Sequence, residues 1–222
     1  MSGTAASGTR KEKALATRRR ILAAAYDLLC EQGYAATTMV AIAERAGVAE
    51  QTVYFTFRSK PAIVTEVIHA SVAGFERWTP TLDADVRQDH LGALRRAAPW
   101  FQAFEAEADP RRAIDLYFEG AIEIFQRISP LLAALNGLGI PELSATLASS
   151  EARRAEAVGF VVAALRKKGR GLRRDLKPAR ARDIFLTLTS TAVYNELTMG
   201  RGWSPRQAVQ WLADLLADQL LA

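Results

Sequence analysis

Residues 37–63 read TTMVAIAERAGVAEQTVYFTFRSKPAI, and this stretch carries the strongest structural signal in the sequence. Its first part places apolar residues at helical spacing and runs into Gly47, whereas the segment after Val48 carries Glu, Gln, Thr and Tyr. A left-handed turn would cost a residue with a Cβ roughly 1–2 kcal/mol, so glycine is the residue expected there. The pattern predicts two short helices joined by a tight turn.

An earlier helix completes a group of three. Apolar residues recur at helical spacing from about Lys11 to Leu29, and Gly33 is placed to end that helix. Thr37 and Thr38 offer hydroxyls that can cap the second helix. Because a tight turn joins the last two of these three helices, the segment predicts a helix-turn-helix.

The third helix is expected to present polar side chains outward. Val53 should point into the core of the three helices, which leaves the polar residues of that helix on the opposite face. These residues are Glu50, Gln51, Thr52, Tyr54 and Thr56. Side chains of these types contact base edges and phosphates. Spacing alone also allows an ordinary helical hairpin with a solvated face.

The composition favours an all-α protein. Half of the 222 residues are apolar, Ala and Leu are abundant, and no alternating strand pattern appears, so we expect about nine helices. The lone Cys30 fits a reducing cytosol. No apolar run approaches the ~18–20 residues of a membrane span, and no signal-peptide core follows the basic N-terminus. The sequence therefore predicts a cytoplasmic protein without a membrane partner.

Breaks in the helical pattern suggest the organisation of the chain. Residues 1–10 are expected to form a disordered arm, 11–60 a helix-turn-helix domain, and 61–222 a larger helical domain. Within the last, 61–78 forms a connecting helix, and a boundary follows near 79–88. Further amphipathic stretches lie at about 90–108, 110–135, 141–168, 178–200 and 204–221.

Charge is distributed unevenly along the chain. Residues 1–60 carry nine Lys/Arg against five Asp/Glu, and residues 151–182 carry eleven against three. A basic N-terminal region suits a polyanion, although charge alone does not distinguish nucleic acid from other partners. The run at 166–182 holds nine basic residues and one acid. It is either a solvated loop between helices or a site for an anionic group.

These motifs resemble the DNA-binding segment of the TetR family of bacterial transcriptional regulators. The pattern TT-x3-IA-x2-AGV followed by TVY-x2-F-x-SK carries the resemblance over residues 16–66. The stretch RGWSP-x5-WLADLL, at 201–216, is similar to the last helix of many members. The resemblance implies a three-helix DNA-binding head, a connecting fourth helix, and a helical core that binds a small ligand and forms a dimer.

The resemblance also implies roles for individual residues. It places Thr38, Met39 and Val40 at the DNA backbone, the start of the third helix in the major groove, and Tyr54 and Lys60 at phosphates. The full predicted DNA-binding set is Thr37, Thr38, Met39, Val40, Ala49, Glu50, Gln51, Thr52, Tyr54, Phe55, Thr56 and Lys60. The chain departs from many relatives in having Ala49 instead of Ser, Val40 instead of Arg or Lys, and Thr56 instead of His. A half-buried Tyr54 is the alternative at that position.

Two further groups of residues are candidates for ligand binding and dimerisation. The predicted ligand-lining residues are Phe75, Trp78, Trp100, Phe101, Phe104, Tyr117, Phe118 and Phe125, and core filling is the alternative for most of them. The predicted dimerisation residues are Phe185, Leu188, Ala192, Trp211, Leu212 and Leu215, because two C-terminal helices carry a wide apolar stripe.

Together these features predict a homodimeric regulator, a repressor that a small hydrophobic ligand releases from a quasi-palindromic DNA operator. A DNA-binding factor without a small-molecule effector is the first alternative, and an all-α enzyme is the second. No catalytic motif supports an enzyme, and no cofactor is expected. His69 and His90 lie far apart and lack ligands at metal-binding spacing, so no metal site is predicted.

Overall fold

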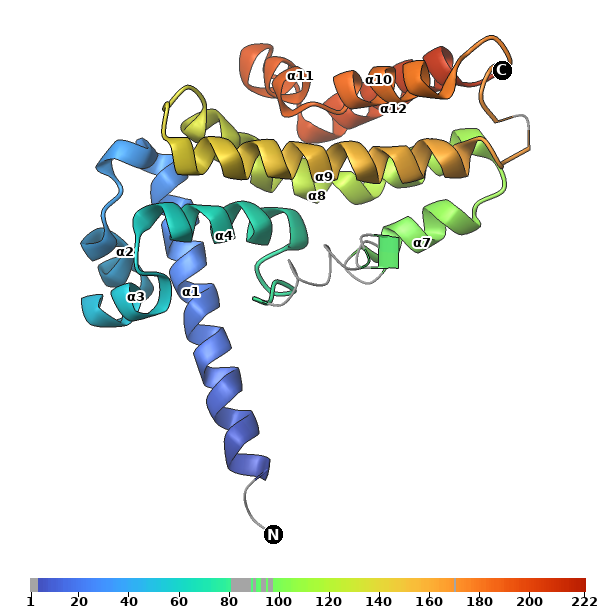
Figure 1. Cartoon of the computed structure of the whole chain (residues 1–222). Coiled ribbons are helices and arrows are strands. Elements are labelled where there is room, and N and C mark those ends of the chain that lie inside the picture. Colours follow the sequence, from blue (N-terminus) through green and yellow to red (C-terminus); the bar gives the residue numbers. More distant parts are fainter. Residues whose placement is uncertain (1–3, 81–88, 90, 93–94, 96–97, 170) are drawn as a thin grey trace. The chain divides into compact units, whose positions relative to one another are not determined.

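The computed structural model describes residues 4–80, 89, 91–92, 95, 98–169 and 171–222 (Figure 1). The helices are α1 (Thr4–Ala36), α2 (Met39–Ala46), α3 (Glu50–Phe57), α4 (Lys60–Ala73), α7 (Pro99–Ala106), α8 (Pro110–Leu135), α9 (Pro141–Leu165), α10 (Pro178–Leu188), α11 (Thr191–Asn195), the π-helix η1 (Glu196–Gly200) and α12 (Pro205–Leu220). The predicted all-α fold is confirmed, since the described residues contain no strand beyond an isolated bridge between Leu172 and Leu221. Within that same part of the chain, no helix is both long and apolar enough to cross a membrane.

The chain divides into two compact units. The first comprises Met1–Thr81 with Pro130–Thr146, and the second comprises Leu82–Ser129 with Leu147–Ala222. The predicted domain boundary near 79–88 falls mostly at residues outside the described ones, as does His90.

The first unit is built around the apolar face of α1. Ile21, Leu22 and Leu29 of α1 are fully buried, as are Val53 of α3 and Ile63 of α4. Two arginines of α1 also bind the α4 segment. Arg18 forms an ion pair with Glu66, and Arg19 donates to the Trp78 carbonyl oxygen at 2.9 and 3.0 Å. These contacts fix the three-helix head against α4.

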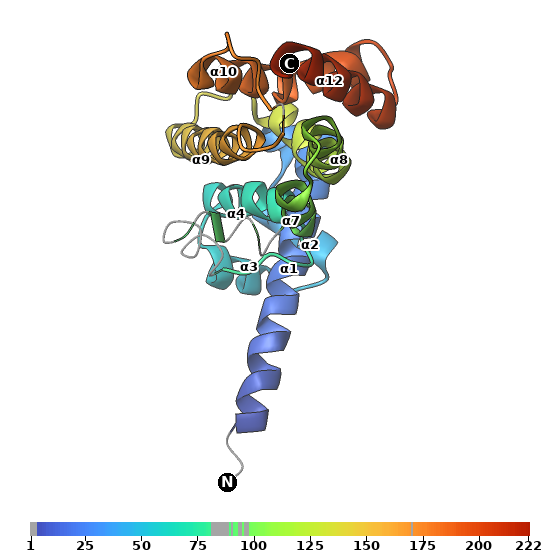
Figure 2. The ribbon, with the colours of Figure 1, turned by 90° about the vertical axis from the view of Figure 1, so that its right-hand side faces the viewer.

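The second unit has a core of aromatic and aliphatic side chains from α7, α8, α9, α10 and α12. Prolines mark where its helices begin: α7, α8, α9, α10 and α12 each start at one. Proline is favoured in the first turn of a helix because backbone N–H groups there have no intrahelical acceptor, so a residue without an N–H loses no hydrogen bond. Ser204 and Gln207 add a capping box to α12. Figure 2 shows the ribbon turned by 90°.

Several predicted boundaries differ from the structure. The arm expected at 1–10 is helical from Thr4, because extending the strong helix that follows costs far less than nucleating a new one. The connecting helix ends at Ala73 instead of Trp78, since Gly74 adopts φ 87° and breaks it. The stretch at 178–200 is three elements, because Thr189 and Ser190 interrupt the helix. By contrast, α8 has the predicted limits.

Candidate nucleic-acid interface and effector region

The turn between α2 and α3 has the geometry that the sequence predicts. Gly47 adopts the left-handed conformation with φ 63° and ψ 43°. Its N–H donates to the Glu44 carbonyl oxygen at 3.1 Å, and the Val48 N–H donates to the Ala43 carbonyl oxygen at 3.0 Å. These two hydrogen bonds satisfy the last carbonyls of α2 in a Schellman motif. The turn therefore sets the direction in which α3 leaves α2.

Helix α3 buries one face and exposes the other. Val53 and Phe57 are buried, which confirms that Val53 faces the core. On the other face Gln51 is exposed, Tyr54 is 46% exposed and Phe55 is 90% exposed. Phe55 and Tyr54 are thus two large aromatic side chains that α3 leaves at the surface.

The start of α3 has no side-chain cap. Ala49 occupies the capping position and contributes no side-chain hydrogen bond. Glu50 follows in the first turn, where a carboxylate interacts favourably with the positive end of the helix dipole. Ala49 and Glu50 are both exposed, as a surface that meets DNA requires.

Only part of the predicted backbone-contacting group is accessible. Thr37 is fully buried, and its hydroxyl donates to the Gly33 carbonyl oxygen at 2.8 Å. Met39 is also buried, so neither side chain presents an exposed surface in this structure. Thr38 is exposed and accepts from the Ala41 N–H at 3.1 Å, and Val40 is exposed. Of the four residues predicted at the start of α2, Thr38 and Val40 are therefore the exposed ones.

Two threonines at the edge of the α3 surface are half-buried. The Thr56 hydroxyl donates to the Thr52 carbonyl oxygen at 2.7 Å. This bond engages the only hydrogen of the Thr56 hydroxyl, so that Thr56 can only accept from a partner. Thr52 keeps its own hydroxyl on the edge of the surface.

Lys60 has partners inside the first unit. Its ammonium donates to the carbonyl oxygens of Tyr34 and Thr37 at 2.8 Å each, and burial lowers its pKa. The sequence assigned Lys60 to phosphate contact alone. The structure instead gives it a position that ties the start of α4 to the chain between α1 and α2.

Most of the predicted effector residues fill the core of the second unit. Phe101, Phe104 and Phe118 are almost completely buried, and Phe125 stacks on Tyr194 with ring centroids 5.1 Å apart. Trp100 lies against Gly120 of α8, because a Cβ added there would be 2.1 Å from the indole Cγ. Close packing of this kind is what the core-filling alternative predicts.

Tyr117 is the polar member of this aromatic group. Its ring is 4.9 Å from that of Phe185 and 5.4 Å from that of Trp100, measured between centroids. Burial raises the pKa of the Tyr117 phenol to about 12, although the charge of Arg154 and a hydrogen bond with Thr189 act in the opposite direction. The neutral hydroxyl of Tyr117 therefore has polar neighbours in Thr189 and Arg154, while its ring packs among aromatic side chains.

Phe75 and Trp78 belong to the first unit instead. Phe75 packs edge-on against Tyr26 at 5.4 Å between centroids, and Trp78 is buried. Both side chains have partners on α1, so core packing accounts for them within that unit.

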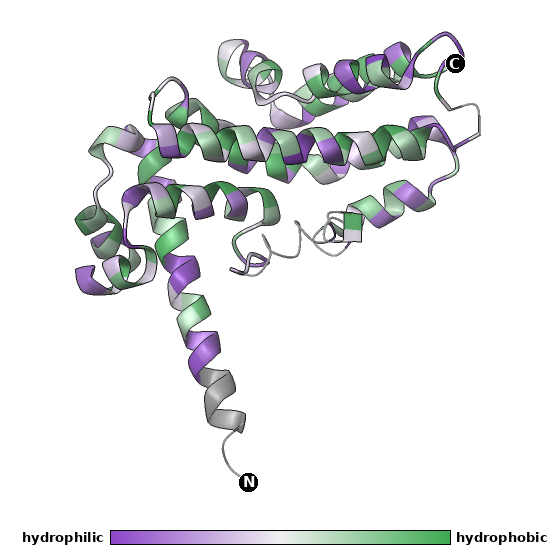
Figure 3. Cartoon of the chain, in the orientation of Figure 1, coloured by the Kyte–Doolittle hydropathy of each residue, from purple (hydrophilic) through white to green (hydrophobic). Residues whose placement is uncertain are grey.

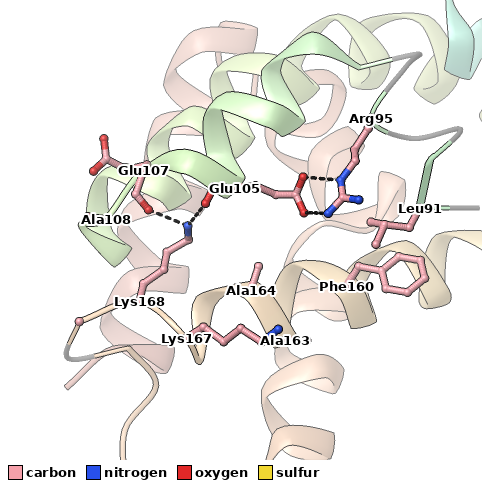
Figure 4. Close-up of a pocket in the computed structure, with 11 residues that line it drawn as sticks. Leu91, Arg95, Glu105, Glu107, Ala108, Phe160, Ala163, Ala164, Lys167 and Lys168 are labelled. Atoms are coloured by element: carbon pink, nitrogen blue, oxygen red, sulfur yellow. Dashed lines mark hydrogen bonds and ion pairs between the residues drawn. The ribbon is translucent and has the colours of Figure 1, made fainter.

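A cavity of about 460 Å³ lies in the second unit, near the ends of α7 and α9 (Figure 4). It is lined by Leu91, Arg95, Glu105, Glu107, Ala108, Phe160, Ala163, Ala164, Lys167, Lys168 and Gly169. None of the eight predicted ligand-lining aromatics belongs to this set. Sequence analysis missed the site, although its lysines begin the basic run at 166–182.

The charged groups of the cavity are largely engaged with each other. Arg95 binds both Glu105 oxygens at 2.6 and 2.7 Å, which lowers the pKa of that carboxyl. The buried Lys168 ammonium donates to the carbonyl oxygens of Glu105 and Glu107 at 2.9 and 2.6 Å. Lys167 is exposed. The free wall is therefore mainly apolar, and its volume suits a small molecule.

The predicted dimerisation residues separate into two groups. Phe185 and Leu212 are fully buried within the second unit, so they contribute to the subunit core, and their role in a dimer interface stays a prediction. Trp211 is 42% exposed and packs edge-on against Trp203 at 5.7 Å between centroids. Leu188, Ala192 and Leu215 also keep exposed surface. These four residues remain candidates for contact with a second copy.

Metal binding finds no support in the described part of the chain, where no three His, Cys, Asp or Glu residues are grouped to hold an ion.

Comparison with known sequences connects the first unit to regulators of transcription. Residues 21–67 match the family described as bacterial regulatory proteins, tetR family. The chain is 43% identical over 60 residues to YvkB of Bacillus subtilis, an uncharacterized HTH-type transcriptional regulator, and 30% identical over 86 residues to the HTH-type transcriptional regulator TtgR of Pseudomonas putida. The first match covers 26% of this chain and 32% of the relative, and the second covers 39% and 41%. None of these descriptions is of an enzyme.

Comparison with solved structures extends the likeness to the whole fold. NalD of Pseudomonas aeruginosa, the secondary repressor of the MexAB-OprM multidrug efflux pump, aligns with a TM-score of 0.63 at 20% identity, covering 94% of this chain and 98% of NalD. SmeT in complex with triclosan aligns with a TM-score of 0.62 at 17% identity, covering 93% and 92%. At these identities the likeness concerns the fold.

Proposed function

We propose that the chain, whose residues 21–67 match the tetR family of bacterial regulatory proteins, is a DNA-binding transcriptional regulator. In this proposal it is a cytoplasmic homodimer that represses transcription from a quasi-palindromic operator and leaves that operator when a small hydrophobic molecule binds. Two heads related by a two-fold axis read two half-sites, so the symmetry of the operator follows from that of the protein.

The exposed face of α3 carries this proposal. Gln51 can form two hydrogen bonds to an adenine edge in the major groove, and Glu50 can accept from a cytosine amine. The exposed Phe55 ring suits contact with a thymine methyl group. Tyr54, also exposed, can donate its hydroxyl to a phosphate. A face with these four side chains offers both base reading and backbone contact.

The second unit supports a hydrophobic effector. Its cavity of about 460 Å³ has an apolar wall that includes Leu91 and Phe160, and the exposed Lys167 is a polar group beside it. Desolvating a sugar or a free phosphate without matched partners costs several kcal/mol, so polar molecules should bind poorly. SmeT, which shares the fold, has been solved in complex with triclosan, a small molecule.

Release from DNA would follow from linkage between the two sites. A ligand that binds better to a head arrangement mismatched with the operator weakens DNA binding by the same free energy. A coupling of about 1–3 kcal/mol corresponds to roughly 5–150-fold weaker binding.

Selection of genomic fragments tests the DNA-binding proposal. The purified protein should enrich fragments that share a quasi-palindromic sequence. Replacing Gln51 with Ala should relax preference at one base position per half-site and cost about 1–3 kcal/mol. The matched control is Gln219→Ala, which removes an exposed glutamine from α12. If the wild type enriches no sequence, or if both variants select like the wild type, the α3 face does not read bases.

A second candidate function is a DNA-binding factor controlled by a protein partner, without a small-molecule effector. The close packing of Phe101, Phe104 and Phe118 favours it, because a filled core leaves no space at those residues. A thermal-shift screen separates the two functions: an apolar compound that both raises Tm and releases DNA supports an effector. No such compound in a broad panel would favour the partner-controlled factor.

A further inference from the structure

The N-terminal part of α1 extends beyond the head to which it belongs. Residues from Arg10 to Ala14 are all exposed, whereas Ile21 and Leu22, about two turns later, are fully buried. Figures 1 and 2 show from two directions that this part of the helix continues past α2 and α3. An isolated helix of this length is marginal in water, so a partner that covers it would stabilise it.

Basic side chains line one side of this extension and continue to Arg20, at its base. Arg10, Lys13 and Arg20 are exposed and follow each other at helical spacings of three and seven residues, which places them within one stripe. At a rise of 1.5 Å per residue the stripe spans about 15 Å of helix. The hydrophilic bands of this part of α1 are visible in Figure 3.

The neighbouring arginines of α1 are used differently. Arg18 pairs with Glu66 and lies over the Phe57 ring at 4.6 Å, and Arg19 donates to the Trp78 carbonyl oxygen. These two side chains hold α1 to the rest of the first unit. The base of the extension is therefore fixed, while the stripe faces solvent.

We propose that this extension is a second DNA-contacting element, whose stripe of Arg10, Lys13 and Arg20 lies against the phosphate backbone beside the half-site that α3 reads. The inference rests on the proposed function, because it adds a contact to the same DNA. Its arguments are charge complementarity with a polyanion and the place of the extension in the same compact unit as α3. The partner is the backbone and not the bases, since exposed Lys and Arg side chains at this spacing carry no base-reading pattern.

The contact has a defined consequence for binding. Each neutralised phosphate contributes about 0.9 to the slope of log K against log salt concentration. Three contacts in each of two subunits would contribute a slope of about 5. The extension would strengthen binding to every sequence alike, leave the choice of operator unchanged, and lengthen the protected DNA.

The test compares two triple variants that remove the same charge. The first is Arg10→Gln, Lys13→Gln and Arg20→Gln in the full chain. The control is Arg166→Gln, Arg174→Gln and Arg180→Gln, which removes three exposed arginines from the second basic block. Gln keeps helix propensity close to that of Lys and Arg, and all six side chains are exposed, so both variants should show wild-type circular dichroism and Tm.

Salt titrations on the selected operator duplex and on a mixed-sequence duplex of equal length give the readout. For the first variant, the slope of log K against log salt concentration should be smaller in magnitude by about 2 to 5 on both duplexes. The ratio of its two affinities should stay that of the wild type, and its hydroxyl-radical footprint should be shorter. The control variant should keep the wild-type slope. Equal slopes in both variants and the wild type would overturn the inference while leaving the proposed function intact. Failure of the wild type to bind either duplex would overturn both. A third outcome would also overturn the inference. If the wild type binds phosphatidylserine vesicles, the first variant does not, and both have the same salt slopes for DNA, the stripe belongs to a membrane surface.

Discussion

Lys60 donates a 2.8 Å hydrogen bond to the carbonyl oxygen of Tyr34 and holds its ammonium 4.0 Å from the centroid of the Tyr34 ring. A second bond of 2.8 Å reaches the Thr37 carbonyl oxygen. Both carbonyls follow Gly33, whose φ of 77° and ψ of 174° interrupt the helical backbone, so the ammonium supplies donors to the chain after that break. Lys60 thus connects the first turn of α4 with the segment that links α1 to α2.

Replacing Lys60 with Met should therefore lower stability. Loss of the ammonium leaves two carbonyl oxygens without their donor, at a cost of about 1–3 kcal/mol, and removes the contact with the Tyr34 ring. The measurement is urea denaturation followed by circular dichroism. Lys13→Met, at an exposed position, is the control and should stay within about 0.5 kcal/mol of the wild type. The opposite result would be an unchanged stability of Lys60→Met together with a salt slope for DNA binding that is lower by about 1 per subunit. Lys60 would then contact a phosphate and would not stabilise the fold.

The helix-turn-helix could be predicted because local chemistry determines it. Gly47 has a backbone conformation that few other residues tolerate, and Val53 lies on the side of α3 that faces α1 and α4. The roles of two adjacent threonines could not be assigned in the same way. Both Thr37 and Thr38 can cap a helix, and only the register of α2 determines that Thr38 does so while Thr37 bonds back to Gly33.

The candidate sites in the second unit were predicted less well. Helix α12 is apolar over more than one face, and a sequence does not distinguish a face buried within the subunit from one that meets a second copy. Leu212 proved to be internal and Trp211 exposed, although they are adjacent. The cavity near Lys168 was missed because residues from three separate segments form it, and their proximity depends on tertiary packing.

Two glycine substitutions should change stability in opposite directions. A Cβ at Gly120 would lie 2.1 Å from the Trp100 indole, so Gly120→Ala should destabilise the protein by about 1–3 kcal/mol. A Cβ at Gly159 of α9 meets no atom within 4 Å, so Gly159→Ala should stabilise by up to about 1 kcal/mol through helix propensity. Thermal or urea denaturation of both variants provides the comparison. Equal effects would mean that Trp100 does not press on α8 in solution.

Substitutions at Trp211 and Leu212 should separate assembly from folding. Trp211→Asp places a charge on an exposed position, so the chain should stay folded and sediment as a monomer. Leu212→Asp buries a charge that has no partner, which costs several kcal/mol and should unfold the second unit. Sedimentation velocity and circular dichroism distinguish these outcomes. A wild-type protein that sediments as a monomer at micromolar concentration, or a Trp211→Asp variant that stays dimeric, would remove Trp211 from the interface.

The buried phenol of Tyr117 should make stability fall in alkaline solution. Its pKa is about 12 in the folded protein, compared with an ordinary value of 10.0, because burial disfavours the phenolate. In the unfolded chain the phenol loses its proton first, so the stabilisation is fully present below pH 10 and is lost as the pH rises towards about 12. Two pKa units set an upper limit of about 3 kcal/mol on this effect. Urea midpoints measured from about pH 9 to about pH 11 should therefore decline more steeply in the wild type than in Tyr117→Phe, which has no proton to lose at this position. Parallel pH profiles for the two proteins would show that the Tyr117 phenol titrates normally and is open to solvent.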